Sequence, residues 1–284
     1  MRKTPKIGEC IAAFPCSSTT WRANVHLNID NSPIYRQKFK YPESYVPIIG
    51  CGSALSMSSC FQILEQLLEG SSLYRDLINP AAQETGVCVK LSDTHESATL
   101  VLGNEMKVLE GSVNPDVTIT MKSIVLQDIA EGNADAFALI GRGRADEKRP
   151  IEFEIHTKER MKDVWEVGKA LLTYFFTPGK IKIKSLSPNL AGHAHGGHPI
   201  PLVYWNGIRH SWILIKAGEI LNKEGERDPW PQVFVILEGK GKVIVGDETF
   251  PIQPEQAIFI PTNSIHQVMA EEDVKLLWLA WNAW

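Results

Sequence analysis

The chain has 284 residues, a formal net charge of −4, and a composition that is 44% hydrophobic and 22% charged. This length suits two domains, each with its own hydrophobic core. The negative balance gives no general attraction to nucleic acid or anionic lipid. No apolar run reaches the roughly 18 residues of a membrane span, and the first residues do not resemble a signal peptide. We therefore expect a soluble protein of the cytoplasm.

Residues 1–56 predict an N-terminal arm or hairpin. Apolar residues alternate with polar ones from Trp21 to Ile29, a pattern typical of a strand. Residues 30–33 carry a turn signal, and residues 35–41 are suited to a returning strand. The purpose of this arm is not evident from the residues.

The cysteines are odd in number and show no paired CxxC spacing: Cys10, Cys16, Cys51, Cys60 and Cys88. This pattern argues against a disulfide framework and favours free thiols in a reducing compartment. The alternative is that Cys10, Cys16 and Cys51 meet around zinc or an iron–sulfur cluster.

Residues 57–184 predict an α+β domain. Helical spacing is seen in residues 60–68, 73–78, 123–130 and 161–175. Strand patterns occur in residues 87–91, 98–102, 106–109, 116–121, 137–140 and 151–155. Glycines after residues 68 and 130 are suited to end two of the helices.

This domain resembles the sterol-carrier-protein family. The resemblance rests on Asn-Pro-Asp-Val-Thr-Ile-Thr-Met at residues 114–121 and on Ile-Ala-Glu-Gly-Asn-Ala-Asp-Ala-Phe at residues 129–137. It implies a five-stranded antiparallel sheet covered on one face by helices. It also implies an apolar tunnel that holds a fatty acyl or sterol-like ligand.

A ligand tunnel is also argued from the apolar content of this stretch. The candidate lining residues are Phe61, Leu64, Leu68, Val117, Ile119, Phe137, Trp165, Leu172 and Phe175. The alternative is that these side chains pack on one another, because an apolar helix face is more often core than ligand site.

Residues 185–204 predict a linker that is rich in proline, glycine and serine. Three histidines, His193, His195 and His198, fall within six residues of it. Neutral imidazole is a common metal ligand, and the intervening glycines let the loop wrap around a divalent ion. The alternative is a solvated linker that tolerates histidine.

Residues 205–284 predict an all-β domain of the jelly-roll or barrel type. Short apolar strands alternate with turn signals over residues 211–216, 233–237, 242–245, 249–252, 257–260 and 274–280. Trp205, Trp212 and Trp230 are candidates to line the mouth of the barrel and stack on a flat or sugar-like ligand.

This C-terminal stretch resembles the cupin superfamily. The spacing His-x-His-x3-Glu-x6-Gly of the first cupin motif is kept, with Glu226, Asp228 and Gln232 in place of the two histidines and the glutamate, followed by Gly239. In the second motif, Pro261 and His266 match, whereas asparagine replaces the glycine at position 263.

The cupin resemblance implies a metal site in the barrel, formed by Glu226, Asp228, Gln232 and His266. Carboxylate and amide oxygens suit hard ions such as magnesium, manganese or calcium better than the softer metals that two imidazoles favour. The alternative is that the site has lost its metal, with Glu226 and Asp228 as solvated loop charges.

Two functions follow from these interpretations. The first is a binding protein that holds an apolar, lipid- or sterol-like molecule in the middle domain. Its cupin barrel then acts as a sensor, a dimerisation module or a second ligand site, without certain enzymatic activity. The alternative is a cupin metalloenzyme of the dioxygenase or isomerase type, acting on a small or apolar substrate. In both, the expected partners are a small molecule and a second copy of the chain in a homodimer.

Overall fold

The computed structural model describes residues 58–79, 83–141 and 148–282. The predicted hairpin of residues 1–56 lies outside these residues, as do Cys10, Cys16 and Cys51. Cys60 and Cys88 are buried free thiols. Burial, reinforced by the nearby Glu96 carboxylate, raises the pKa of the Cys60 thiol to about 12, so this thiol stays protonated.

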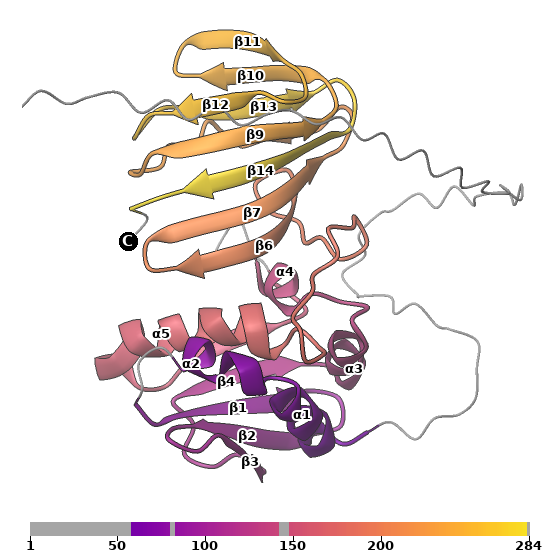
Figure 1. Ribbon diagram of the computed structural model, residues 1–284, viewed down its shortest axis with the longest axis vertical. Helices are drawn as coiled ribbons and strands as arrows, with labels where there is room; N and C mark the ends of the chain where they lie inside the picture. The colour runs from indigo at the N-terminus through magenta and orange to yellow at the C-terminus, as the bar shows by residue number, and fades with distance from the viewer. Residues whose placement is uncertain (1–57, 80–82, 142–147, 283–284) are drawn as a thin grey trace, which may run out of the picture. The chain divides into compact units, whose positions relative to one another are not determined.

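The described residues build two regions with separate hydrophobic clusters (Figure 1). We call residues 60–175 the α+β region and residues 198–280 the two-sheet region. No helix among the described residues has both the length and the apolar character to cross a membrane.

The α+β region contains five α-helices: α1 (Cys60–Glu69), α2 (Arg75–Ile78), α3 (Ser123–Glu131), α4 (Ala136–Ile140) and α5 (Met161–Ala170). Two 3₁₀ turns, Ser72–Tyr74 and Lys158–Arg160, precede α2 and α5, and a π-helical turn, Leu171–Phe175, extends α5. The predicted helices at residues 60–68, 73–78, 123–130 and 161–175 are therefore confirmed.

Local capping explains where two of these helices begin and end. Ser59 and Gln62 form a capping box at the start of α1, each side chain bonding to the other residue's backbone N–H. Gly132 ends α3 in the left-handed conformation, with φ of 78°, which glycine adopts without steric cost.

One predicted strand is wrong. Residues 137–140 form α4 instead of a strand, because the Asp135 side chain accepts a hydrogen bond from the Ala138 backbone N–H, 2.8 Å away, and caps the helix. A short apolar run is ambiguous between helix and strand by periodicity, and the cap decides it here.

The five-stranded sheet has the order β3-β2-β1-β4-β5. Its strands are β1 (Thr85–Leu91), β2 (Ser97–Leu102), β3 (Lys107–Glu110), β4 (Val117–Met121) and β5 (Glu152–Ile155). The prediction of a wholly antiparallel sheet is wrong, because β4 pairs with β1 in parallel. β1 to β3 form a meander, and the chain then returns to place the apolar β4 beside the central strand β1. The alternation of apolar and polar residues along a strand does not indicate whether it pairs with its neighbour in parallel or antiparallel.

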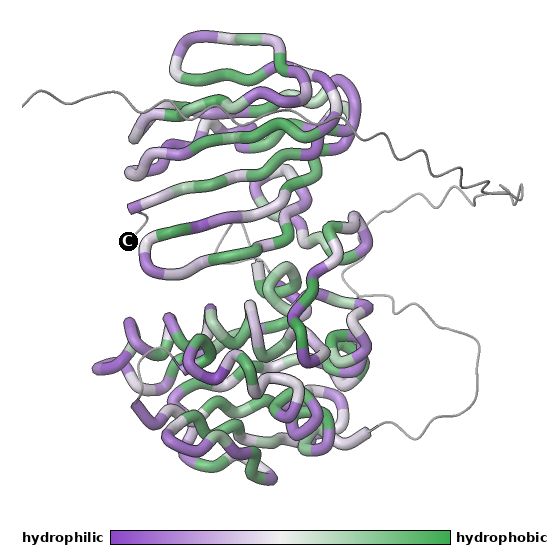
Figure 2. Tube along the Cα trace, in the orientation of Figure 1, coloured by the Kyte–Doolittle hydropathy of each residue, from purple (hydrophilic) through white to green (hydrophobic). Residues whose placement is uncertain are grey.

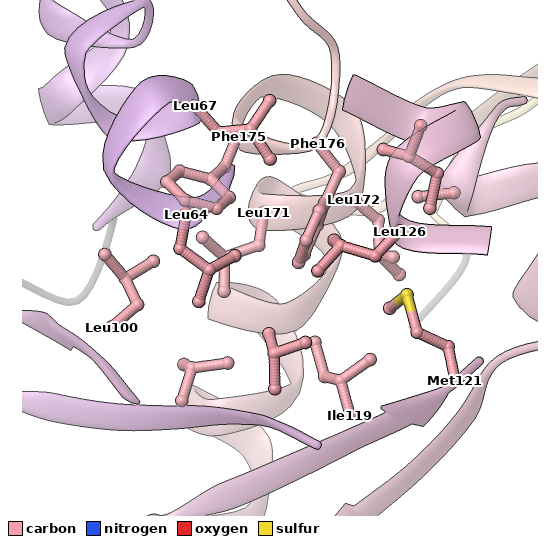
Figure 3. Close-up of a cluster of buried hydrophobic side chains, with 14 of the residues drawn as sticks. Leu64, Leu67, Leu100, Ile119, Met121, Leu126, Leu171, Leu172, Phe175 and Phe176 are labelled. Atoms are coloured by element: carbon pink, nitrogen blue, oxygen red, sulfur yellow. The ribbon is translucent and has the colours of Figure 1, made fainter. Parts of the chain in front are cut away.

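The core of the α+β region lies between this sheet and the helices. Figure 3 shows side chains of α1, α3 and the segment after α5 pointing toward those of β2 and β4. Leu64, Ile119 and Phe175 have no exposed surface, and Leu100 keeps only 1%.

The two-sheet region contains β6 (His198–Trp205), β7 (Ile208–Ile215), β8 (Ile220–Leu221), β9 (Gln232–Glu238), β10 (Gly241–Val245), β11 (Glu248–Ile252), β12 (Ala257–Ile260), β13 (His266–Ala270) and β14 (Val274–Ala280). They form a five-stranded sheet, β12-β9-β14-β7-β6, and a four-stranded sheet, β11-β10-β13-β8. Figure 2 shows apolar residues recurring along these strands, and those on the inner faces share one core cluster.

The prediction of a closed barrel is not met by the strand pairing. Among the described residues, no ladder of hydrogen bonds joins the two sheets. The edge strand β6 carries Pro199 and Pro201, and the edge strand β11 carries Pro251. Because proline has no N–H to donate, it is typical of sheet edges.

The predicted linker is shorter than residues 185–204. Its last part, from His198 onward, belongs to β6 and pairs with β7. The prolines that indicated a linker are compatible with this edge strand, which is why the composition was misleading.

Candidate functional site

Polar side chains gather at one end of the two-sheet region, on the inner face of its five-stranded sheet. Strand alternation in β7 puts Arg209 and Ser211 on the same face as Ile213 and Ile215. Both isoleucines belong to the core cluster, so the first two residues face inward as well. Trp278 of β14 lies opposite Ser211 in the sheet register.

Gln232, the first residue of β9, has a fixed amide orientation. The Trp278 indole Nε1–H donates a hydrogen bond of 2.6 Å to the Gln232 Oε1 atom. An indole N–H is a donor only, so the reversed amide would place two donors against each other. The amide NH₂ group of this 1%-exposed side chain therefore points away from Trp278.

The Gln232 NH₂ group has two acceptors. It donates to the Asp228 Oδ2 atom at 2.9 Å and reaches the His266 Nε2 atom at 3.4 Å. The other ring nitrogen of His266, Nδ1, lies 3.0 Å from the Ser264 carbonyl, which only accepts. Nδ1 therefore donates to this carbonyl, and Nε2 faces the amide and lies 3.5 Å from the Asp228 Oδ2 atom. We call Asp228, Gln232, His266 and Trp278 the amide network.

A cation and two aromatic rings adjoin the amide network. The Arg209 guanidinium lies 4.5 Å from the ring centre of Trp230 and 5.9 Å from that of Tyr204. The Tyr204 ring is 6.2 Å from Trp278, and its hydroxyl bonds with the Ser211 hydroxyl at 3.2 Å. We call Arg209, Trp230 and Tyr204 the arginine–aromatic cluster.

Electrostatics link the two groups of residues. Burial raises the pKa of the Tyr204 phenol, and the nearby Asp228 carboxylate raises it further. The hydrogen bond to Ser211 and the charge of Arg209 act in the opposite direction. Tyr204 is therefore a neutral phenol within range of one positive and one negative charge.

The residues present do not fit a cupin metal site. A metal needs the lone pairs of His266 Nε2 and Asp228 Oδ2, and the Gln232 NH₂ group faces both of them. The only acceptor of this amide, Oε1, is engaged by Trp278. Within the described part of the chain, no group of three or more His, Cys, Asp or Glu side chains is arranged to hold a metal ion.

The structure brings together three of the four predicted metal ligands of the cupin motifs. Glu226, the fourth, pairs with the Nδ1 atom of His195 at 2.6 Å. In the predicted histidine site, the His198 Nε2 atom lies 3.0 Å from Glu219. The His193 ring contacts the His198 ring at a centroid distance of 5.4 Å. A metal at these histidines stays a prediction.

The predicted apolar lining residues lie mostly in the core of the α+β region. Those with 7% exposure or less are Leu64, Val117, Ile119, Phe137, Leu172 and Phe175. Phe61 and Leu68 pack against the same cluster, whereas Trp165 is 49% exposed and stacks edge-to-face on Phe153. A side chain that faces a water-sized cavity keeps some accessible surface, so the fully buried members fill a core here. Binding of an apolar ligand in this region stays a prediction.

Sequence reasoning identified Trp230 as a candidate for a ligand contact but missed Arg209, Tyr204 and Trp278. The sequence of β7 could have indicated Arg209, because this residue lies on the same face of the strand as the buried Ile213. A charged residue on the core-facing phase of a strand marks a site, because unpaired charge is costly to bury. Of the other tryptophans, Trp212 packs in a separate buried cluster and Trp205 is 43% exposed.

Comparison with protein families identifies a cupin domain over residues 212–282. Solved structures similar to the chain include a cupin 2 conserved barrel domain protein from Salinispora arenicola CNS-205, with 16% identity, 36% of this chain and 90% of that chain covered, and a TM-score of 0.33. An RmlC-like cupin from Shewanella frigidimarina matches with 18% identity, 31% and 78% coverage, and a TM-score of 0.29.

A predicted oxalate decarboxylase from Thermotoga maritima matches with 16% identity, 30% and 79% coverage, and a TM-score of 0.28. Comparison with curated proteins gives no match. The chain therefore carries a C-terminal cupin domain, and this domain contains the amide network. A cupin domain is compatible with an enzyme or with a binding module.

Proposed function

We propose that the cupin domain is a small-molecule-binding module that holds its ligand at the polar end without a metal ion. The observation that carries this proposal is the amide of Gln232, which donates to Asp228 and faces His266 where a cation would otherwise be required. Within the network, the Gln232 NH₂ group donates to the Asp228 carboxylate and faces the His266 imidazole. In this proposal, these two acceptors need no metal ion, because the amide already provides them with hydrogen-bond donors.

Aromatic side chains support a ligand site at this end. Trp230 is only half-buried, and its ring offers flat apolar surface next to polar groups, whereas the Tyr204 ring packs edge-to-face on Phe137 and Trp278. Such a combination of aromatic walls with a few oriented polar groups is typical of small-molecule sites. The rigid amide network gives the site a fixed floor, which reduces the entropic cost of binding.

The apolar-ligand hypothesis for the α+β region is the weaker candidate, because most of its proposed lining residues pack against one another in the buried core. The rival function is a cupin metalloenzyme, which needs a metal at His266 and Asp228. Metal analysis separates this rival from the proposal directly.

The test combines elemental analysis with protein-observed NMR on untagged, full-length protein. We expect less than about one tenth of a metal ion per chain, and fragment binding that persists in EDTA. Binding is expected to shift the indole N–H signals of Trp230 and Trp278, assigned from Trp→Phe variants.

Two results contradict the proposal. About one metal ion per chain, lost in His266→Ala, supports the metalloenzyme instead. Absence of binding at the polar end by fragments of any charge, in protein with an intact melting transition, removes the binding module.

A further inference from the structure

The arginine–aromatic cluster has hydrogen-bond donors without acceptors. The Arg209 guanidinium offers five N–H donors, and none of the described residues accepts a hydrogen bond from it or forms an ion pair with it. The Trp230 indole N–H is buried and also lacks a partner. A buried donor without an acceptor costs about 1–3 kcal/mol.

Other cations of similar burial are paired. Lys184 Nζ contacts the Asp135 carboxylate at 2.6 Å, and Arg160 contacts Asp116 at 3.4 Å. Lys182 donates to the Ser71 hydroxyl and to the Thr177 carbonyl. Arg209 differs from these in that it contacts two aromatic rings, and no described residue accepts a hydrogen bond from it.

The charge around Arg209 limits the kind of anion that fits. The Asp228 carboxylate lies close enough to influence Tyr204, as Arg209 does. The positive charge of Arg209 and the negative charge of Asp228 leave the site close to neutral. A dianion such as a phosphate monoester would meet repulsion from Asp228, whereas a monoanion is matched by Arg209 alone.

We infer that the ligand of this polar end is a small organic monocarboxylate, whose two oxygens are bound by the Arg209 guanidinium. This inference rests on the proposed binding function and specifies its ligand class. The planar guanidinium fork matches a carboxylate through two parallel N–H···O bonds. Stacking on Trp230 holds the guanidinium plane in place, so less side-chain freedom is lost on binding.

The amide network gives the remaining part of the ligand its environment. The Tyr204 ring contacts Arg209 on one side and Trp278 on the other, and Trp278 bonds to Gln232, so aromatic rings connect the guanidinium with the amide network. An acid with a flat apolar body therefore suits the site better than a compact inorganic anion. Benzoate combines both features and is the probe of choice.

The experiment is a titration of full-length protein in EDTA with benzoate, with the neutral isostere benzamide, and with the dianion phenyl phosphate. Binding is followed by the indole N–H signals of Trp230 and Trp278. We expect benzoate to bind about 10- to 100-fold more tightly than benzamide, as appropriate for hydrogen bonds to a charged group. Phenyl phosphate is expected to bind more weakly than benzoate.

Variants assign the effect to Arg209. Arg209→Gln is expected to lower benzoate affinity to the level of benzamide, with benzamide affinity unchanged. Arg209→Lys keeps the charge without the planar fork and is expected to fall between wild type and Arg209→Gln. Arg227→Gln is the matched control, because it removes an exposed arginine that bonds to the Asn263 carbonyl in the neighbouring loop.

The outcomes separate the inference from the proposed function. Equal affinities for benzoate and benzamide, or no loss in a folded Arg209→Gln variant, overturn the carboxylate inference while leaving a neutral-ligand module in place. Tighter binding of phenyl phosphate than of benzoate overturns the preference for a monoanion. Binding of none of the three probes at the polar end contradicts the inference and counts against the module itself.

Discussion

The two regions of this protein treat buried polar and charged groups differently. In the α+β region and the segment that follows it, Lys182 donates to Ser71 and Thr177, and Lys184 pairs with the Asp135 carboxylate. In the two-sheet region, Gln232 and His266 are each 1% exposed and bonded to each other, and Arg209 beside them has no acceptor among the described residues. Paired groups stabilise a fold, whereas an unpaired donor next to a rigid network is available for a ligand.

This comparison shows why burial alone is a poor guide to a binding site. The predicted apolar lining was chosen for being hydrophobic, and most of it packs as core. The polar end was predicted only in part, because its most informative feature is that Arg209 has no hydrogen-bond acceptor among the described residues. Three substitutions test this difference between the regions.

The largest effect is expected for Phe175→Ala in the α+β region. Phe175 has no exposed surface, and its removal leaves a cavity that costs about 3–5 kcal/mol in the free energy of unfolding. Trp165→Ala is the matched control, because this second predicted lining residue is 49% exposed. We expect Trp165→Ala to lower the free energy of unfolding by about 1 kcal/mol or less. This is less than a third of the loss expected for Phe175→Ala.

Urea unfolding followed by circular dichroism measures both variants. A loss below about 1.5 kcal/mol for Phe175→Ala would show that the side chain lines a space instead of filling a core. An acyl- or sterol-sized mass bound to the wild-type protein and absent from the variant would then support the tunnel.

A smaller effect is expected for Gln232→Glu in the two-sheet region. The change removes the NH₂ donors and puts a carboxylate beside Asp228 and His266, which costs about 2 kcal/mol in the absence of metal. The same change creates one imidazole and two carboxylates, a ligand set suited to zinc or manganese. We therefore expect the melting temperature to fall in EDTA and to recover with Zn²⁺ or Mn²⁺.

Gln267→Glu controls for the loss of amide donors. Gln267 lies on β13 with His266 and donates to the carbonyls of Asn222 and Lys223. Its variant is expected to lose stability without any metal-dependent recovery. If folded Gln232→Glu protein shows no response to either metal, the amide does not stand in the place of a cation.

The smallest effect concerns pH. Burial lowers the pKa of Lys182 from its ordinary 10.5 to about 8. Between these values the unfolded chain holds the proton and the folded chain does not, so the free energy of unfolding rises as pH increases from about 8 to about 10.5. Below pH 8 the fold carries the full cost of the buried ammonium.

Lys182→Met removes this contribution. We expect the stability of the wild-type protein relative to Lys182→Met to rise by about 1 kcal/mol between pH 7.5 and pH 10, a value reduced from the full shift because the side chain is half-exposed. Thermal melting of both proteins across this range measures it. A difference that does not change with pH would mean that the Ser71 and Thr177 contacts offset the burial.

Several elements of the fold were predictable from local patterns. The helix over residues 161–175 and the strands around residues 233–237 and 274–280 follow from periodicity, because each element buries one face. The motif spacing from Glu226 to Gly239 correctly indicated the cupin domain. It also predicted the meeting of Asp228, Gln232 and His266.

The sequence by itself therefore determined the main secondary structure and the position of the cupin domain. Only the tertiary structure decided the parallel pairing of β1 with β4, the separation into two sheets, and the orientation of the Gln232 amide toward Asp228, His266 and Trp278. The reason is that these features depend on partners far apart in the chain. Gln232 and His266 are 34 residues apart in the sequence. Gln232 and Trp278, whose hydrogen bond fixes the orientation of the amide, are 46 residues apart. Local pattern specifies which face of a strand is buried, but not which distant donor meets which acceptor there.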